Sequence, residues 1–265
     1  MNLRLYILML VAMTGRIVSG ADTTSAPEAP AGMVVVPAGE HRPLFVLPNE
    51  PKTIPVARFA LDKFPVTNGD FLEFVSANPR WRRSAVKRLF ADQNYLKHWS
   101  GDLELNDAAR TNQPVVWISW FAAKAFAQWK GRRLPTVAEW EYAAAASPTR
   151  VDGDNDPEFQ RALRNWYSTP APAELSRVGA GLPNCFGLFD LHALVWEWTS
   201  DFNSAIVTGD ARGDTGLDRQ LFCGAGSAGA KDTANFPAFM RYGFRSSLKA
   251  DYTVHNLSFR CAKDL

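Results

Sequence analysis

Two short apolar runs near the start of the chain have the pattern of β-strands. Residues 32–38 (GMVVVPA) are rich in β-branched side chains, and the run ends at Pro37 and Gly39. Residues 59–66 (FALDKFPV) alternate roughly between apolar and polar positions before a turn. We therefore expect one strand in each of these segments.

Capping boxes mark the starts of two helices. Thr67 and Asp70 have the T-x-x-D spacing, and the apolar positions after them predict a buried helix face that ends before Pro79. Thr136 and Glu139 have the equivalent T-x-x-E spacing at the start of the segment VAEWEYAAAA. In each box, two side chains satisfy backbone N–H groups that the first helical turn leaves unpaired.

The rest of the pattern is short or irregular. Residues 114–120 (PVVWISW) predict a strand, and residues 121–131 (FAAKAFAQWKG) predict a helix that ends at Gly131. The apolar positions of this helix lie on one stripe: Ala122, Ala125, Phe126 and Trp129. Residues 80–112 predict short helices and loops, and residues 147–183, rich in Asp, Asn, Pro and Gly, predict long ordered loops. Together these elements indicate an α+β fold with little regular structure.

Residues 1–20 have the pattern of a secretory signal peptide. One early positive charge, Arg4, precedes an apolar stretch at residues 5–13 that is too short to span a bilayer. Small residues at the end of this region predict cleavage after Gly20 or Ala21. We therefore expect a periplasmic or secreted protein, and a cytosolic chain with an apolar N-terminus is the alternative.

The remaining sequence is interpreted as a linker followed by one domain. Residues 21–31 are small, polar and rich in proline, a composition that buries too little apolar surface to order itself. Residues 32–265 are long enough for one core, and 46% hydrophobic content with nine Trp is typical of a packed globule. No later segment is apolar enough to cross a membrane, so we expect no membrane insertion after signal cleavage.

The charge pattern gives no support for nucleic-acid binding. The chain has 29 basic and 27 acidic residues, and loss of the signal peptide removes Arg4 and Arg16 but no acid. The mature chain is therefore formally neutral, unlike most nucleic-acid-binding domains. The one basic run, at residues 80–88, predicts a solvated helix face, with a docking patch for an acidic partner as the alternative.

The cysteines and histidines lack the spacing of metal ligands. Cys185, Cys223 and Cys261 are an odd number for an exported protein, and they can form at most one disulfide within the chain. None of them belongs to a CxxC pair, and the four histidines show no HExxH or similar arrangement. The sequence therefore does not favour a zinc site.

Four separated motifs, in order, resemble the formylglycine-generating-enzyme (sulfatase-modifying-factor) family. They cover almost the whole predicted domain: GMVVVPAG at 32–39, DKFPVTN at 62–68, PVVWISW with GRRLPTVAEWEYAA at 114–144, and VWEWTSD with NLSFRCA between 195 and 262. The resemblance implies the irregular C-type-lectin-like α+β fold of that family. It also implies which positions to inspect for chemistry.

The family's oxidases hold Cu(I) with two cysteines that follow a Gly-Gly-Ser segment. In this chain the matching stretch runs from Gly224 through Ser227 to Arg245 and contains no cysteine, with Ala230 near the first expected position. Because soft thiolates are the ligands that Cu(I) prefers, we expect no copper. This departure from the family pattern argues against the namesake reaction.

The three cysteines keep several interpretations open. Cys261 falls on a position that is usually a structural cysteine in the family, but its usual partner position is Ala127 here. Cys223 is either a substitute thiol or a buried small hydrophobic residue. A disulfide between Cys185 and Cys223 is a further alternative that the sequence does not decide.

The resemblance also implies a structural Ca²⁺ site. In the family this segment supplies two carboxylates, here Asp190 and Glu197, and two backbone carbonyls, here of Ala193 and Val195. Hard cations prefer such oxygen ligands. The alternative is that Glu197 simply alternates outward within the motif VWEW.

Four residues match positions near the family's substrate groove: Trp196, Ser227, Arg245 and Ser246. Glycines before Ser227 permit close approach of a backbone, and Arg245 can clamp a carboxylate or a peptide carbonyl. Ser227, Arg245 and Cys223 are the candidates for catalysis, with Asp232 as the nearest acid. Each of these residues has packing or surface exposure as its alternative role.

Three functions follow from these expectations. The first is an exported oxidative maturation or accessory factor that acts, without the copper dithiolate, on a peptide-like product or a periplasmic enzyme. The second is a non-catalytic, lectin-like binding or assembly protein that recognises a partner through residues 147–183 and 80–112. The fold alone does not choose between these two functions, because function resides in a site and not in a scaffold. The third is a formylglycine-generating oxidase that uses Cys223. The expected partner of this chain is a peptide-like small molecule or a periplasmic protein.

Overall fold

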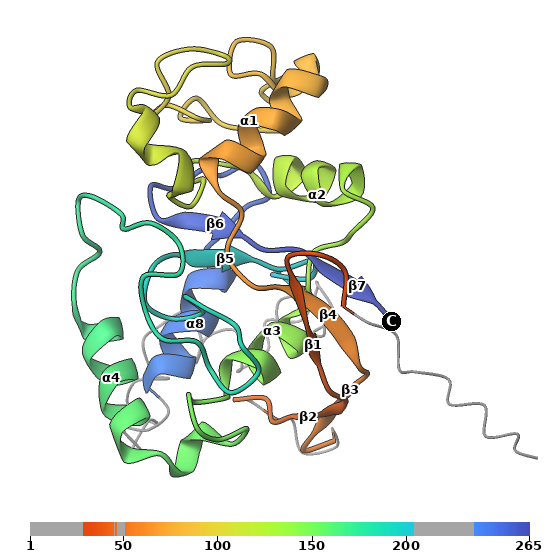
Figure 1. Cartoon of the computed structure of the whole chain (residues 1–265), viewed down its shortest axis with the longest axis vertical. Coiled ribbons are helices and arrows are strands. Elements are labelled where there is room, and N and C mark those ends of the chain that lie inside the picture. Colours follow the sequence, from red (N-terminus) through yellow and green to blue (C-terminus); the bar gives the residue numbers. More distant parts are fainter. Residues whose placement is uncertain (1–28, 45, 47–50, 204–235) are drawn as a thin grey trace, which may run out of the picture.

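The computed structural model describes residues 29–44, 46, 51–203 and 236–265. The predicted signal peptide and most of the predicted linker lie outside these residues. The described chain forms a mixed α and β structure with short strands, and the expected irregular α+β class is confirmed (Figure 1). Within the described segments, no helix combines the length and apolar character needed to cross a bilayer.

A three-stranded antiparallel sheet joins the beginning and end of the domain. It consists of β1 (Met33–Val36), β4 (Phe59–Asp62) and β7 (Ala262–Asp264), with β4 in the centre. The register places Met33 opposite Asp62 and Phe59 opposite Asp264. The strands predicted at the two N-terminal runs are therefore confirmed, and all four residues of the central strand β4 are buried.

Two smaller strand pairs complete the β-structure of the described residues. β2 (Gly39–His41) pairs antiparallel with β3 (Ile54–Val56). β5 (Trp196–Trp198) pairs in parallel with β6 (Leu257–Phe259), which brings the two C-terminal family motifs side by side. In Figure 1 this parallel pair lies between the α1 and α2 end of the molecule and the α3 and α8 end.

The helices begin where their caps predict. α1 (Asn68–Ala77) has the complete capping box of Thr67 and Asp70, and α3 (Val137–Ala144) has that of Thr136 and Glu139. α2 (Trp120–Trp129) begins after Ser119, whose side chain accepts a hydrogen bond from a first-turn N–H. A 3₁₀ turn, η1 (Pro79–Trp81), follows α1 directly, as expected from the proline.

The predicted strand at residues 114–120 is wrong. The segment is extended but forms only an isolated bridge at Pro114, and Trp117 adopts a left-handed conformation with φ of 57°. Its backbone N–H groups donate to two separate segments: Val115 to Val66, and Trp117 and Trp120 to Val254 and Ala250 of one loop. Because these partners belong to different parts of the chain, the segment crosses the core without joining a sheet.

The expectation of loops alone at residues 147–183 is also wrong. This region contains η3 (Gly153–Asn155) and the helix α4 (Pro157–Ser168), which Asp156 caps and Pro157 begins. Its buried residues are Gln160, Leu163 and Tyr167, so the inward face is partly polar. The expectation of short helices at residues 80–112 is confirmed by η1 and η2 (Ala108–Asn112).

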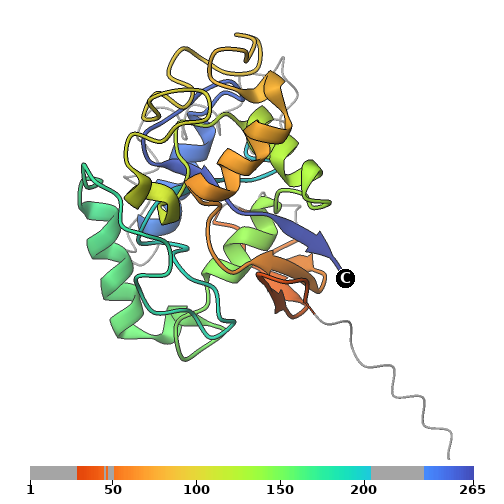
Figure 2. The same ribbon diagram turned by 45° about the horizontal axis from the view of Figure 1, so that its top comes forward.

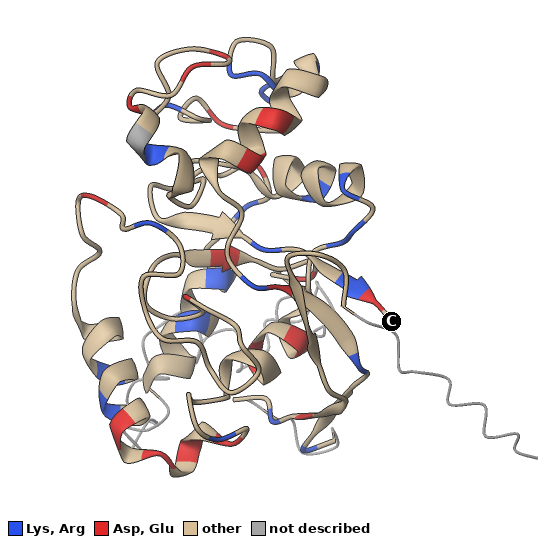
Figure 3. Ribbon diagram, viewed as in Figure 1, with Lys and Arg blue, Asp and Glu red and all other residues tan. Residues whose placement is uncertain are grey.

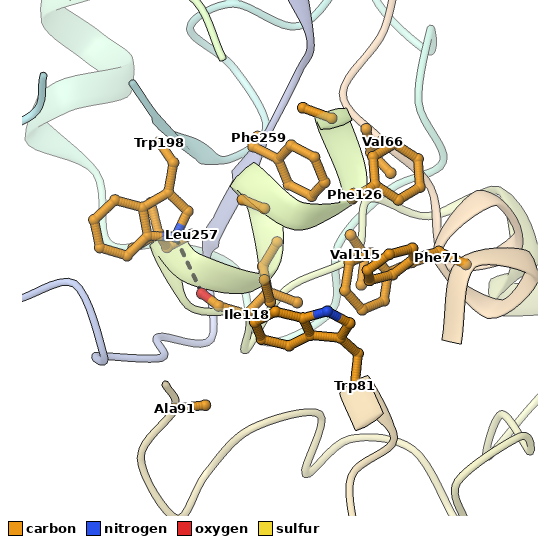
Figure 4. Packing of buried hydrophobic residues seen from close by; sticks show 14 of the residues in the cluster. Val66, Phe71, Trp81, Ala91, Val115, Ile118, Phe126, Trp198, Leu257 and Phe259 are labelled. Atoms are coloured by element: carbon orange, nitrogen blue, oxygen red, sulfur yellow. Dashed lines mark hydrogen bonds between the residues drawn. The ribbon is translucent and has the colours of Figure 1, made fainter. Parts of the chain in front are cut away.

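The largest hydrophobic cluster lies between α1, α2 and the β5–β6 pair. Phe71 stacks on Phe126 at 5.8 Å between ring centroids, and Phe259 meets Phe126 edge to face at 5.2 Å. Figure 4 shows these rings together, with the indole N–H of Trp198 donating to the carbonyl of Ile118 at 3.1 Å. This cluster fixes one side of β5, whose other neighbours form the site described below.

The last helix, α8 (Phe236–Ser246), lies at the opposite end from α1 and packs against α4. Figure 2, a second view, again places α4 along one edge of the molecule, away from the β1–β4–β7 sheet. α3, α4 and α8 lie below β5 in Figure 1, and residues of these four elements line one recess.

Candidate functional site

A narrow recess opens among α3, α4, β5 and α8, and its walls are mainly aromatic. The aromatic recess, as we call it, is lined by five rings: Trp140, Trp166, Tyr167, Trp196 and Phe244. Trp196 and Phe244 stack at 4.3 Å between centroids, and Trp166 meets Tyr167 edge to face at 4.4 Å. Such close ring packing gives the recess a fixed shape.

Beside these rings, one carboxylate is held by two arginines. Glu141 of α3 accepts hydrogen bonds from Nε and Nη2 of Arg241, the shortest at 2.7 Å, and from Nη1 of Arg245 at 2.5 Å. All three side chains are at least 89% buried. Both arginines come from α8, where they supply its only basic residues (Figure 3). The cluster therefore fastens α8 to α3.

The charge state of this cluster follows from its contacts. Burial alone would raise the pKa of Glu141, but the two guanidinium groups hold that pKa well below its usual range. Glu141 is therefore ionised at neutral pH, and so are both arginines. The cluster carries one surplus positive charge.

Arg241 and Arg245 use their nitrogens differently. Arg241 donates through Nε and Nη2 to Glu141 and through Nη1 to the hydroxyl of Tyr167 at 3.3 Å. Arg245 donates through Nη1 alone among the described residues, and its guanidinium lies 4.8 Å from the ring centroid of Trp140. The Nε and Nη2 groups of Arg245 thus keep donor capacity at the recess that it lines.

A tyrosine and a histidine extend this polar network. The ring of His192 bonds to the carbonyl of Ala144 through Nε2 at 2.8 Å, so Nε2 carries the proton because a carbonyl only accepts. Nδ1 therefore accepts the hydroxyl proton of Tyr167 at 3.1 Å. Burial, together with the nearby charge of Arg241, lowers the pKa of His192 to about 3. His192 is neutral in the folded protein and orients the Tyr167 hydroxyl.

This histidine makes the free energy of unfolding depend on pH. Its folded-state pKa lies below the unfolded value of about 6.5, so the unfolded chain binds more protons as pH falls through that value. We expect wild type to lose about 2 kcal/mol of stability through His192 between pH 7 and pH 5. Urea unfolding at both pH values, compared with His192→Gln, measures this difference.

The glutamine variant can keep both hydrogen bonds, donating to Ala144 and accepting from Tyr167, but it does not titrate. It should therefore show a flatter pH dependence than wild type. The matched control is His255→Gln, which removes an exposed histidine and should keep the wild-type dependence. An unchanged slope in His192→Gln would contradict a buried neutral histidine.

A second buried ion pair lies behind the recess. Glu197 of β5 accepts three hydrogen bonds from Arg260, at 2.8 to 3.1 Å, and one from the indole N–H of Trp140 at 2.7 Å. Both charged side chains are fully buried. Each carboxylate oxygen of Glu197 thus has a donor, and its charge is compensated within the protein.

The other residues expected at calcium are placed around the same turn. Asp190 has a φ of 58°, and its carboxylate accepts the N–H of Gly179 at 2.5 Å. Ala193 is exposed and Val195 is buried. Since Arg260 already neutralises Glu197, this donor set does not fit a calcium ligand at Glu197. We derive no chemistry through calcium: the calcium site predicted from the sequence stays untested, and the ion pair with Arg260 leads us to expect no calcium at Glu197.

Of the predicted groove residues, the structure brings Trp196 and Arg245 together at the recess. Ser246 is turned away, because its hydroxyl donates to the carbonyl of Tyr242 within α8 at 2.9 Å. Ser227, Cys223 and Asp232 lie outside the described residues. The predictions for these three residues therefore stay untested.

Sequence reasoning missed the most connected residues of the site: Glu141, Tyr167, His192 and Arg241. Glu141 occupies a position in the α3 motif VAEWEYAA where the flanking residues are apolar, and an acid on a buried helix signals a buried cationic partner. No comparable signal identified Arg241, because α8 itself was not predicted, and Arg245 was named only through the family resemblance.

The described cysteines are both free thiols. Cys261 is buried, and its backbone N–H donates to Asp62 Oδ2 at 2.7 Å. Burial and the nearby Asp62 carboxylate raise the pKa of the Cys261 thiol well above its usual value. Cys185 is exposed. Neither described thiol lines the aromatic recess.

Comparison with known proteins agrees with the resemblance carried by the motifs. Residues 20–265 match the sulfatase-modifying factor enzyme 1-like domain. The formylglycine-generating enzyme of Streptomyces coelicolor is 33% identical over 255 residues, which covers 80% of this chain and 80% of that protein. The inactive C-alpha-formylglycine-generating enzyme 2 of Mus musculus is 32% identical over 256 residues, covering 80% and 77%.

A more partial relative is the serine/threonine-protein kinase pkn1 of Chlamydia pneumoniae, 30% identical over 145 residues. That alignment covers 54% of this chain but only 23% of the kinase, so the chain spans about a quarter of that protein's length. Among solved structures, PvdO from Pseudomonas aeruginosa superposes with a TM-score of 0.47 and 20% identity, covering 88% of this chain and 94% of that chain. From the domain match and the aligned relatives, the chain is a member of the formylglycine-generating-enzyme (sulfatase-modifying-factor) family.

Proposed function

We propose that this chain is a maturation or accessory factor that binds a peptide-like product, or a peptide segment of an exported enzyme, at the aromatic recess. The observation that supports this proposal most directly is the aromatic recess. Five rings from four elements lie there beside a buried ion cluster with one surplus positive charge. The cavity volume is about 10 Å³, room for about one water molecule, so we propose that the ligand lies across the aromatic mouth of the recess and not inside it. Aromatic rings and arginine also dominate the binding energy of peptide interfaces.

The cysteines of this chain argue against a copper-dependent oxidation of a substrate cysteine. Between Ser227 and Arg245 the sequence has no cysteine to supply a thiolate for Cu(I). Of the described thiols, Cys261 is buried with a raised pKa and Cys185 lies outside the recess. The proposed factor therefore works on its ligand without a copper dithiolate.

A non-catalytic binding role is the second candidate, and one observation favours it. The histidine nearest the recess, His192, has both ring nitrogens engaged and a pKa lowered to about 3, so it cannot serve as a base near neutral pH. Glu141 is likewise committed to two arginines. One relative, the murine protein, is itself named inactive, which agrees with a binding role.

Incubation with Cu(I), oxygen and a sulfatase-type cysteine peptide tests the oxidase alternative. We expect the peptide to stay unmodified, as read by mass spectrometry and by an aldehyde-reactive hydrazide. The Streptomyces coelicolor enzyme, whose name states this activity, is the positive control in the same buffer. Multiple-turnover aldehyde formation by this chain would overturn the proposal.

If aldehyde does form, Cys223→Ser identifies its origin. Loss of turnover in that variant would assign the reaction to Cys223. The chain would then have the least favoured of the three functions, that of a formylglycine-generating oxidase. The matched control is Cys185→Ser, which removes an exposed thiol outside the recess. Activity that survives both substitutions would point to a thiol-independent oxidase.

A further inference from the structure

A second hollow lies at the α1 end of the molecule, away from α8 and the aromatic recess (Figure 1). Its volume is about 580 Å³, which is within the range of ligand sites. Its lining residues all come from the segment 83–102, between η1 and η2. Beyond η1 the basic run at residues 80–88 forms turns and irregular backbone instead of the expected helix face. We call this cavity the basic hollow, because part of that run lines it.

The walls of the basic hollow are fixed by hydrogen bonds between residues far apart in the chain. Arg83 Nη1 donates to a backbone carbonyl 16 positions later at 2.6 Å, and the backbone N–H of Ser84 donates to Asp102 at 2.8 Å. The backbone N–H of Thr253 donates to Asp92 at 3.0 Å, which connects the hollow to the C-terminal part of the chain. The hollow is therefore shaped before a ligand arrives, which lowers the entropic cost of binding.

Positive charge exceeds negative charge around this hollow. Residues 80–106 contain six basic and three acidic side chains, whereas the whole chain has a net charge of only +2. The two acids that line the hollow, Asp92 and Asp102, accept hydrogen bonds from backbone and hydroxyl groups of the protein. In the described part of the chain, neither acid lies within ion-pair distance of the lining arginines, Arg83 and Arg88.

The two lining arginines have donors to offer. The side chain of Arg88 is exposed and has no hydrogen bond or ion pair with the residues that the structure describes. Arg83 uses one guanidinium nitrogen for the carbonyl of Trp99 and keeps its other donors. Because a guanidinium can bind both oxygens of a carboxylate, the hollow offers two places for acidic groups.

The rest of the lining favours an acidic peptide over a chain of phosphates. Asp92 and Asp102 would repel closely spaced phosphates, but their remaining lone pairs can accept N–H groups of a peptide backbone. The amide of Gln93 can donate to a peptide carbonyl. Leu89 and Leu103, which are 74% and 44% exposed, each follow a lining residue directly and can cover an apolar side chain of the peptide.

We infer that the basic hollow is a docking site for an acidic peptide segment of a partner protein. Arg83 and Arg88 pair with acidic side chains of that segment, and the acids of the hollow accept its backbone N–H groups. This inference goes beyond the proposed function, because the hollow shares no lining residue with the aromatic recess. An accessory factor with two such contacts gains affinity for one partner through effective concentration.

Two fluorescein-labelled peptides that differ only in charge test this docking site on the full chain. The acidic peptide has the sequence GDELDELG, and the neutral peptide has the sequence GNQLNQLG. We expect fluorescence anisotropy to show at least about tenfold tighter binding of the acidic peptide, since each exposed ion pair contributes up to roughly fivefold in affinity. The preference should decrease when NaCl is raised from about 50 to about 300 mM, because salt screens exposed charges.

Arg88→Glu should weaken binding of the acidic peptide by at least about tenfold, because repulsion replaces an attractive pair. The fold should remain intact, since Arg88 is exposed and makes no contact that the substitution would break. The matched control is Arg161→Glu, which makes the same charge reversal at an exposed position of α4, outside the hollow. This control should keep the wild-type affinity, and thermal melting of both variants verifies folding.

Three results would overturn the inference. Equal affinity of wild type for the two peptides would exclude recognition of acidic side chains. An unchanged affinity in folded Arg88→Glu would exclude the basic hollow as the place of binding. Stronger displacement of the acidic peptide by a single-stranded oligonucleotide of equal charge would assign the hollow to a nucleic acid. These outcomes are independent of the aldehyde assay, so this inference and the proposed function can fail separately.

Discussion

Glu141→Gln should lower the free energy of unfolding by about 3–5 kcal/mol, the range measured when one partner of a buried ion pair is removed. The substitution keeps the shape of the side chain but leaves Arg241 and Arg245 as two uncompensated cations at less than 10% exposure. It also weakens the four hydrogen bonds that the two arginines of α8 donate to Glu141 of α3. Equilibrium unfolding in urea or guanidinium measures the loss.

The matched control makes the same change at the surface. Glu73 pairs with Lys130 at 3.5 Å, but its side chain is 68% exposed. Glu73→Gln should therefore change stability by less than about 1 kcal/mol. A Glu141→Gln protein as stable as this control would contradict a buried cluster in which Glu141 compensates the charge of the two arginines.

If Glu141→Gln does not fold, a second variant keeps the comparison measurable. Arg245→Gln leaves one cation facing one anion, so it should be much less destabilising than Glu141→Gln. Arg241→Gln should fall between them, because Arg241 makes most of the hydrogen bonds to Glu141 and also bonds to Tyr167. From the most to the least stable variant, the predicted order is therefore Arg245→Gln, Arg241→Gln, Glu141→Gln.

The cluster also explains how a helix near the C-terminus becomes part of the site. Glu141 and Arg241 are 100 positions apart, and α8 reaches α3 only in the folded chain. The aromatic recess exists where α8 closes against α3, α4 and β5, with Phe244 stacked on Trp196. Loss of the ion cluster should therefore loosen the recess as well as lower stability.

Local signals in the sequence predicted the elements that depend on local interactions. The capping boxes at Thr67 and Thr136 are formed by residues three positions apart, and both helices begin as predicted. The β-branched run at residues 32–38 was likewise identified by its own composition, and β1 lies within it. The resemblance to a known family supplied the overall fold, which no single element determines.

Elements that depend on distant partners were not predicted. The run at residues 114–120 has strand composition, yet its N–H groups donate to two unrelated segments, at Val66 and at residues 250–254, so it forms no ladder. α4 was missed because its sequence is mostly polar and charged, although its apolar and polar positions fall on opposite faces of the helix. Asp156 and Pro157 are nevertheless start signals of a helix, because Asp is a preferred N-cap and Pro is favoured in the first helical turn.

The candidate site likewise contains residues that were identified from the sequence and contacts that were not. Trp196 and Arg245 were identified through the family resemblance and do line the recess. The pairing of Arg245 with Glu141, and of Glu197 with Arg260, joins residues 104 and 63 positions apart. Ion pairs between residues so far apart in the chain leave no local sequence pattern. The second of these pairs decides whether Glu197 is paired with an arginine of this chain or is available to a metal cation from solution.

Arg260→Gln is expected to be as destabilising as Glu141→Gln, by about 3–5 kcal/mol. Arg260 is fully buried and donates to Glu197, to the carbonyl of Asp62 at 3.1 Å and to that of Phe189 at 2.8 Å. Its loss leaves a buried carboxylate without a cation and buried carbonyls without donors. The change in the urea midpoint relative to wild type measures the effect.

The double variant Glu197→Gln/Arg260→Gln separates charge from packing and is also decisive for calcium. Removing both charges should recover part of the stability lost in Arg260→Gln, because no unpaired ion is then buried. If Glu197 instead served a bound Ca²⁺, chelation with EDTA would lower the melting temperature of wild type but not that of the double variant. Because Arg260 already occupies the carboxylate, we expect EDTA to leave wild type unchanged, and a chelator-induced shift confined to wild type would show that calcium competes for Glu197 after all.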